Sequence, residues 1–105
     1  MSPIDFNGLD TAVHGPVRLG ALTVLHLDGP LDFTTLKKRL RVVDGVLGLH
    51  LRTLEQARYI TASRSFIGNR PKTTYRITPI GRRALRSYLG AMQAVITAIQ
   101  ESDRL

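Results

Sequence analysis

Cationic side chains cluster in the second half of the chain, at a spacing suited to binding a polyanion. Residues 64–86 contain seven arginines and lysines and no acidic residue. Guanidinium and ammonium groups neutralise phosphates, and the hydroxyls of Thr73 and Thr74 can donate hydrogen bonds to phosphate oxygens. The seven cations are Arg64, Arg70, Lys72, Arg76, Arg82, Arg83 and Arg86. We interpret the first three as phosphate-binding candidates, whereas each of the last four is explained equally well as a solvated surface charge.

The overall charge indicates the same kind of partner. The 105 residues carry a formal net charge of +7, while the contents of 43% hydrophobic and 22% charged residues are ordinary for a globular chain. Residues 37–86 hold thirteen basic and two acidic residues, and the rest of the chain holds two basic and six acidic residues. The positive charge is therefore regional, as a binding face for DNA, RNA or an anionic membrane surface requires.

The residues needed for most enzyme and metal sites are missing from the sequence. There is no cysteine, no His-x-x-x-His pair, no Gly-x-Ser-x-Gly and no phosphate-binding Gly-x-x-x-x-Gly-Lys motif. His14, His26 and His50 are far apart in the chain, and His50 is expected to be partly buried and hydrogen-bonded. We therefore predict a non-enzymatic protein without a metal or another cofactor.

The sequence shows no sign of membrane targeting. No apolar run approaches the roughly 18 residues that a membrane span needs, and the first residues lack the charged start and apolar centre of a signal peptide. We expect a cytoplasmic protein that does not bind a membrane.

The basic segment is preceded by residues with helical periodicity. A helix that is apolar nearly all round is expected from Pro16 to residues 28–30, where Asp-Gly-Pro ends it. A short extended piece follows at residues 31–33. Thr34 or Thr35 is the expected N-cap of a second helix that runs to about residue 40 and faces Lys37, Lys38 and Arg41 to solvent.

A third helix is predicted from Asp44, as its N-cap, to about Ala57. Leu47, Leu51 and Leu54 recur at the spacing of one helix face, which we expect to be buried. The second and third helices, with their short connection, would form a helix-turn-helix.

Alternating residues on both sides of a cationic loop predict a β-hairpin. The loop is expected at residues 68–72, with strands on either side and Tyr75 packed in the core of the hairpin. Thr78 and Pro79 then begin a last helix to about Glu101. The predicted fold is α+β, mostly α: one winged helix-turn-helix domain over residues 1–105, with its core at 14–78 and a dimerisation helix at 79–101.

Three segments resemble those of small bacterial and archaeal winged-helix regulators of the MarR, ArsR and PadR-like groups. Residues 51–60 (LRTLEQARYI) are similar to the HLRxLExAGYI segment of these regulators, and residues 75–82 (YRITPIGR) to their YxLTxxGR segment. Residues 18–22 resemble the start of their first core helix, so that the likeness covers about residues 14–96. Arg58 stands where these proteins usually have a glycine, which suits a left-handed helix end.

The resemblance implies a homodimeric transcription regulator whose third helix enters a major groove. The outward face of that helix would comprise Gly45, Val46, Gly48, Leu49, Arg52, Thr53 and Gln56. Arg52, Thr53 and Gln56 can hydrogen-bond to bases, whereas Val46 and Leu49 could touch thymine methyl groups. Thr34 and Thr35, with Lys37, Lys38 and Arg41, are expected to bind phosphates, and Arg70 to reach a minor groove.

The last helix carries an apolar stripe that a domain of this size would not cover completely. We predict that its second half packs against a second copy, since the family implies dimerisation through terminal helices. The stripe consists of Leu85, Tyr88, Leu89, Met92, Val95, Ile96 and Ile99.

The favoured function is a sequence-specific DNA-binding regulator, with repression by operator occupancy as its expected action. Two alternatives stay open: a winged-helix protein-interaction module that uses the apolar face of the third helix, and a non-specific nucleic-acid binder. A small-molecule effector is conceivable, but no polar cluster in the sequence indicates its site.

Overall fold

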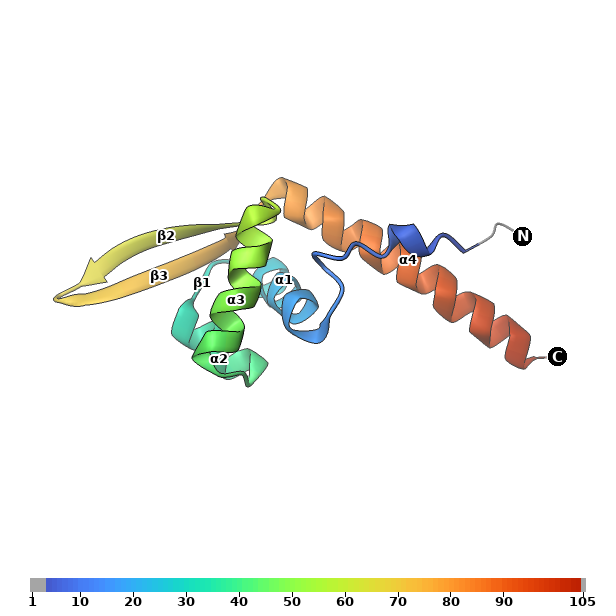
Figure 1. The fold of residues 1–105 in the computed structure, drawn as a ribbon, viewed down its shortest axis with the longest axis horizontal. Helices are drawn as coiled ribbons and strands as arrows, with labels where there is room; N and C mark the ends of the chain where they lie inside the picture. The colour runs from blue at the N-terminus through green and yellow to red at the C-terminus, as the bar shows by residue number, and fades with distance from the viewer. Residues whose placement is uncertain (1–3, 105) are drawn as a thin grey trace.

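The elements follow the predicted order, and Figure 1 shows a helical body from which a hairpin and a long helix project. The computed structural model describes residues 4–104. Its elements are a 3₁₀ helix η1 (Phe6–Gly8), α1 (Pro16–Asp28), β1 (Leu31–Asp32), α2 (Phe33–Leu40), α3 (Asp44–Gln56), β2 (Ile60–Ile67), β3 (Arg70–Ile77) and α4 (Pro79–Asp103). The α+β, winged helix-turn-helix prediction is confirmed.

The N-caps of α2 and α3 differ from the prediction. The carboxylate of Asp32, not Thr34 or Thr35, caps α2 by accepting a hydrogen bond from the Thr35 N–H at 2.8 Å. Val43 occupies the N-cap position of α3, without a side-chain hydrogen bond, and Asp44 is the first helical residue. There Asp44 forms an ion pair with Lys37 at 2.7 Å, so that its charge joins α3 to α2.

Both helices of the helix-turn-helix end at an arginine with a left-handed backbone. Arg41 follows α2 with φ 56°, and Arg58 follows α3 with φ 65°. After α3, the Arg58 N–H donates to the Glu55 carbonyl and the Tyr59 N–H donates to the Leu54 carbonyl. This pair of bonds is the Schellman arrangement, which a glycine usually completes. Arg58 therefore adopts a left-handed backbone in place of the usual glycine, rather than ending the helix with another cap.

The core lies where α1, α2 and α3 meet the base of the sheet and the first half of α4. The predicted inward residues Leu47, Leu51 and Leu54 are buried, as is Leu36 of α2. α1 is not buried all round, since Leu27 at its end is 73% exposed. The other buried members are Val13, Ala21, Leu22, Leu25, Ile60, Tyr75, Ile77, Leu85 and Tyr88. Both the hairpin and α4 are thus anchored in the same core.

The three strands form an antiparallel sheet in the order β1-β3-β2. β1 pairs only with residues 74 and 75, so the outer part of the hairpin is a two-stranded ribbon. The pairing continues to Ile67 and Arg70, which leaves a turn of two residues rather than the predicted five-residue loop. Gly68 has φ 62° at the first turn position, where a two-residue hairpin of type II′ requires a positive φ.

α4 begins as predicted, with Thr78 as its N-cap and Pro79 at the first position. Its first turn lies against the residue that precedes β2, since a Cβ on Gly81 would come within 2.1 Å of the Tyr59 carbonyl oxygen. The second half extends away from the other helices, at the opposite end of the molecule from the hairpin (Figure 1), and the longest dimension is 62 Å.

Candidate nucleic-acid interface

The outer face of α3 is exposed along its whole length. Leu49, which lies opposite the buried leucines, is 57% exposed, and Val46, on the flank of this face, is 41% exposed. The space beside Gly45 and Gly48 is open, so that another molecule can approach the helix backbone there. Arg52 and Gln56, like Gly45, are exposed, whereas Gly48 and Thr53 are half-buried. The Thr53 hydroxyl donates to the Leu49 carbonyl at 3.2 Å, which leaves Arg52 and Gln56 as the freer polar side chains of this face.

α2 offers fewer free cations than the sequence predicted. Lys37 is paired with Asp44, while Lys38, Arg41 and Thr34 are exposed and Thr35 is half-buried. Arg39, which the sequence reading did not select, is paired with Asp28 at 2.5 Å. Lys38 and Arg41 are therefore the α2 cations that remain exposed without such a pair among the described residues.

The helix N-terminus of α2 already carries a negative charge. Hydrogen bonds from Thr35 lower the pKa of Asp32 below its usual value, with smaller contributions from the charges of Lys72 and Lys38. An anion at this position is stabilised by the helix dipole and by the free N–H groups. The Asp32 carboxylate thus occupies the place that we expected a DNA phosphate to take.

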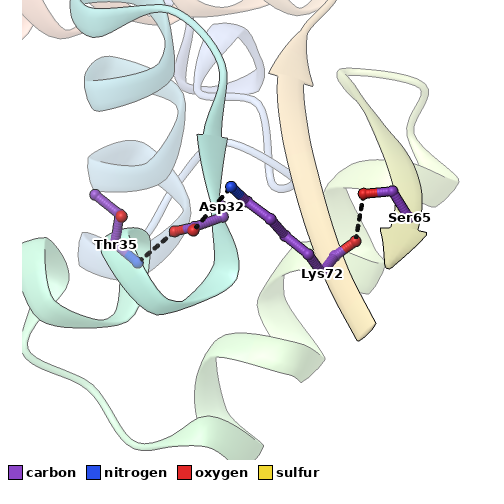
Figure 2. Close-up of polar contacts among 4 residues, drawn as sticks. All are labelled: Asp32, Thr35, Ser65 and Lys72. Atoms are coloured by element: carbon purple, nitrogen blue, oxygen red, sulfur yellow. Dashed lines mark hydrogen bonds and ion pairs between the residues drawn. The ribbon is translucent and has the colours of Figure 1, made fainter. Parts of the chain in front are cut away.

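Figure 2 shows how this carboxylate ties the hairpin to α2. Lys72 of β3 reaches Asp32 at 3.8 Å, and the Ser65 hydroxyl of β2 donates to the Lys72 carbonyl at 3.5 Å. Three elements, β2, β3 and the β1–α2 junction, are joined through these contacts. The hairpin is therefore connected to the start of α2 by a polar contact in its outer, two-stranded part as well as by the core.

The predicted wing residues lie on both faces of the hairpin. Because side chains alternate along a strand, Arg70, Lys72 and Thr74 lie on one face and Thr73 on the other. Arg64 is paired with Thr73 across the strands. Arg64 and Arg70 are exposed, while Lys72, Thr73 and Thr74 are half-buried. Arg70 is next to the turn, farthest from the core, so that the wing presents a cation at its tip.

The sequence reading missed two exposed apolar side chains at the wing tip. Phe66 is 74% and Ile67 is 63% exposed, although both lie in a predicted strand. Val43, before α3, is also 67% exposed. The sequence did contain a signal for the exposure of Phe66 and Ile67, because both lie several residues along the hairpin from the buried residues Ile60 and Tyr75.

Arg18 and His50 have structural roles beneath α3. The Arg18 guanidinium donates to the carbonyls of Thr11, Ala12 and His14 and, at 2.8 Å, to Nδ1 of His50. The prediction of a half-buried, hydrogen-bonded His50 is confirmed. The chain before α1 is thereby attached to α3.

Tyr75 is buried and Tyr59 is half-buried, so neither ring is free to stack on a nucleic-acid base. Tyr75 is 7% exposed, as predicted, and burial raises its pKa. The Tyr59 hydroxyl donates to the Asp10 carboxylate, a bond that raises the pKa of Tyr59 to about 12. Asp10 and Tyr59 line a pocket of about 460 Å³ beside α4, with Arg83 and Ser87 among its other residues.

The predicted dimer stripe of α4 divides into two parts. Leu85 and Tyr88 are 4% and 3% exposed, and the Tyr88 hydroxyl lies 2.8 Å from Nδ1 of His14. These two residues belong to the chain's own core and offer almost no surface to a partner. The remaining residues are exposed (Leu89, Ile96 and Ile99) or half-buried (Met92 and Val95).

The described residues hold no cluster of three His, Asp or Glu side chains that could bind a metal ion. In that same part of the chain, no helix combines the length and apolar character that crossing a bilayer needs.

Comparison with known proteins identifies the type of domain. Residues 17–96 match the family described as winged helix DNA-binding domain. An uncharacterized protein of Methanocaldococcus jannaschii is 36% identical over 73 residues, which are 70% of this chain and 79% of that protein. The structure of a transcriptional regulator homologue from Pyrococcus horikoshii OT3 superposes with a TM-score of 0.76 and 30% identity, over 84% of this chain and 87% of the other.

A more distant structure has the same fold. It is that of a protein named as a putative transcriptional regulator of the MarR family, from Enterococcus faecalis V583. The two structures superpose with a TM-score of 0.74 and 21% identity, over 90% of this chain and 86% of the other.

Proposed function

The chain belongs to the winged helix DNA-binding domain family, and from this membership we propose that it is a homodimeric, sequence-specific transcription regulator that represses by occupying its operator. The exposed outer face of α3 is the observation that carries the proposal. A helix presented in this way has the dimensions of a major-groove reader.

In this proposal, α3 reads bases with few but distinct contacts. Arg52 donates to guanine and Gln56 to adenine, while Val46 and Leu49 contact thymine methyl groups. The open space beside Gly45 and Gly48 lets the start of the helix approach the groove closely. With only two free polar side chains on this face, DNA shape and backbone contacts supply much of the affinity.

The wing and α2 provide the backbone contacts. Lys38 and Arg41 lie in the last turn and at the C-cap of α2, and Arg70 is at the wing tip. β2 and β3 contain no acidic residue, so the ribbon can lie along a phosphate backbone without repulsion. In a twofold dimer, two α3 helices roughly 34 Å apart would occupy successive major grooves.

The test is a matched pair of charge deletions measured by fluorescence anisotropy across a salt series. Arg70→Ala removes a wing cation, whereas Arg104→Ala removes an exposed cation at the far end of α4. We expect Arg70→Ala to weaken binding of all DNA and to lower the salt slope by about 0.9, the value for one phosphate contact. Arg104→Ala should change neither quantity. Equal effects of both variants would contradict a DNA-binding wing.

One observation supports a second function. Val43, Val46 and Leu49 form an exposed apolar group at the start of α3, and such a group also suits a protein partner. In that case, binding of the partner, and not of DNA, would shift the backbone NMR signals of these residues.

A further inference from the structure

The wing tip carries two large, exposed apolar side chains close to cationic ones. Phe66 and Ile67 expose 74% and 63% of their surface, at the end of the hairpin farthest from the helices (Figure 1). An exposed, apolar end of a two-stranded ribbon is an aggregation hazard, which proteins usually remove with charges. Retaining two large apolar side chains there is explained most simply by a partner that covers them.

The surroundings of the tip indicate what that partner is. Arg64 lies on the same face of the ribbon as Phe66, whereas Arg70 and Lys72 lie on the face of Ile67, where Lys72 is paired with Asp32. The two strands themselves contain no acidic residue. An exposed apolar side chain and a cation on each face of the wing tip suit a polyanion that also has an apolar interior. Duplex DNA provides both, with phosphates at the rim of the minor groove and stacked bases within it.

The tip of the wing is a tight turn with a proline beside Phe66. Its turn has only two residues, and Pro71 lies directly across the strands from Phe66. Proline fixes its own backbone angle and donates no ladder hydrogen bond, which fits a position next to the turn on an unpaired edge. The Phe66 side chain therefore projects from a strand whose partner has a fixed backbone angle at the facing position.

We propose that the wing tip enters the DNA minor groove and that Phe66 inserts between two base pairs, unstacking them and bending the duplex, while Ile67 packs against the groove wall. This inference rests on the proposed DNA-binding function and adds a mechanism of shape recognition to it. Apolar wedges of this kind kink DNA in other minor-groove binders.

Insertion of an apolar wedge and insertion of an arginine favour different DNA sequences. Arginine insertion favours A-tracts, because their minor groove is narrow and strongly negative. A wedge favours TA steps, which unstack easily, and disfavours stiff A-tracts. Two duplexes with the same length, charge and A·T content, one of alternating dT and dA and one with dA on one strand and dT on the other, therefore separate the two mechanisms.

The first experiment compares affinities for these two duplexes by fluorescence anisotropy. We expect the natural chain to prefer the alternating duplex, and Phe66→Ala to weaken binding to it by roughly 5- to 150-fold, the effect of losing one stacking contact. The salt slope should stay the same, because no charge is removed. Phe6→Ala, which truncates another exposed phenylalanine in η1, is the control and should have no effect.

The second experiment uses the absence of tryptophan from the chain. The variant Phe66→Trp places a single fluorophore at the tip, and Phe6→Trp places one in η1. Stacking on a base should quench the fluorescence of the first variant, and not of the second, when the alternating duplex is added.

The outcomes distinguish the proposed wedge from the proposed DNA-binding function on which it rests. If both duplexes bind equally and Phe66→Ala changes nothing, the wedge is refuted while DNA binding stands. If neither duplex binds at low salt, the proposed function itself fails. If the fluorescence of Phe66→Trp responds to anionic phosphatidylglycerol vesicles and not to DNA, the tip is a lipid-binding site and the wedge is again refuted.

Discussion

At the scale of single residues, Arg41 and Arg58 adopt a left-handed backbone conformation, which is strained for residues that have a Cβ. Arg41 and Arg58 end α2 and α3 with positive φ, a conformation that costs an ordinary residue roughly 1–2 kcal/mol. Arg58 keeps its position because its carbonyl accepts a hydrogen bond from Thr78 at 2.7 Å, the same residue that caps α4. Contacts at the junction of α3, the sheet and α4 thus stabilise the strained conformation of Arg58.

Replacing Arg58 with glycine should stabilise the fold. Glycine removes the steric cost of the left-handed backbone, but part of that gain is lost to the greater freedom of the unfolded chain. We expect Arg58→Gly to raise the free energy of unfolding by about 0.5–1 kcal/mol in urea denaturation. Arg58→Ala keeps the Cβ and is the control. A gain of the same size from alanine would show that the arginine side chain, not its backbone, is the unfavourable part.

Tyr59 should make stability depend on alkaline pH. Its hydroxyl donates to Asp10, and its pKa is raised to about 12 from an ordinary value of 10.0. A raised pKa means that the folded state holds the proton more tightly, so the contribution is complete below pH 10 and is lost as pH rises toward 12. Stability measured across this range should fall more steeply for the natural chain than for Tyr59→Phe. Burial also raises the pKa of Tyr75, so some slope will remain in the variant. Identical slopes would contradict the Tyr59–Asp10 bond.

At the scale of elements, the link between the wing and α2 depends on Asp32. This carboxylate caps α2 and also faces Lys72 of the wing (Figure 2). Asp32→Ala should lower the free energy of unfolding by about 1 kcal/mol, since an N-cap is lost. Asp32→Asn retains a capping side chain and should lose only a fraction of that. Thermal unfolding of the two variants provides the comparison, and equal losses would mean that charge, not capping, is the main contribution.

The elements were predictable from the sequence, and their exact junctions were not. Periodicity placed α3 and its buried leucines correctly, because that signal is local. The predicted N-cap of α2 is two or three residues late, because Thr34 and Thr35 are also good capping residues and the choice of Asp32 depends on β1 pairing with β3. Likewise, alternation puts Phe66 on the core side of β2, but it cannot show that the strand extends beyond the core. The stripe of α4 was found, yet the burial of Tyr88 depends on His14, which is distant in the sequence.

At the scale of the whole molecule, the wing and the second half of α4 project from opposite ends of the body (Figure 1). The exposed part of the α4 stripe therefore lies far from the proposed DNA surface, as a twofold dimer with two free wings requires. Leu89, Ile96 and Ile99 supply its apolar surface.

Charges in this stripe should abolish the dimer without unfolding the chain. Ile96 and Ile99 are 40% and 57% exposed, so the double change Ile96→Glu with Ile99→Glu leaves the core intact. Sedimentation analysis should then find monomers, and affinity for a two-half-site operator should fall at least tenfold. Leu27→Glu alters a leucine in α1 that is 73% exposed, and it should leave the dimer intact. A natural chain that sediments as a monomer at all concentrations would refute the proposed assembly.

The most direct test of a sequence-specific regulator is its discrimination between DNA sequences. We would measure binding by fluorescence anisotropy to the region upstream of the chain's own gene and to a scrambled duplex of the same composition, each across a salt series. The account predicts a preference of roughly 10³-fold or more for one site and a steep negative salt slope. The best-bound duplexes would also be selected from a random pool. If these duplexes bind as weakly as scrambled DNA, the proposed sequence specificity is contradicted.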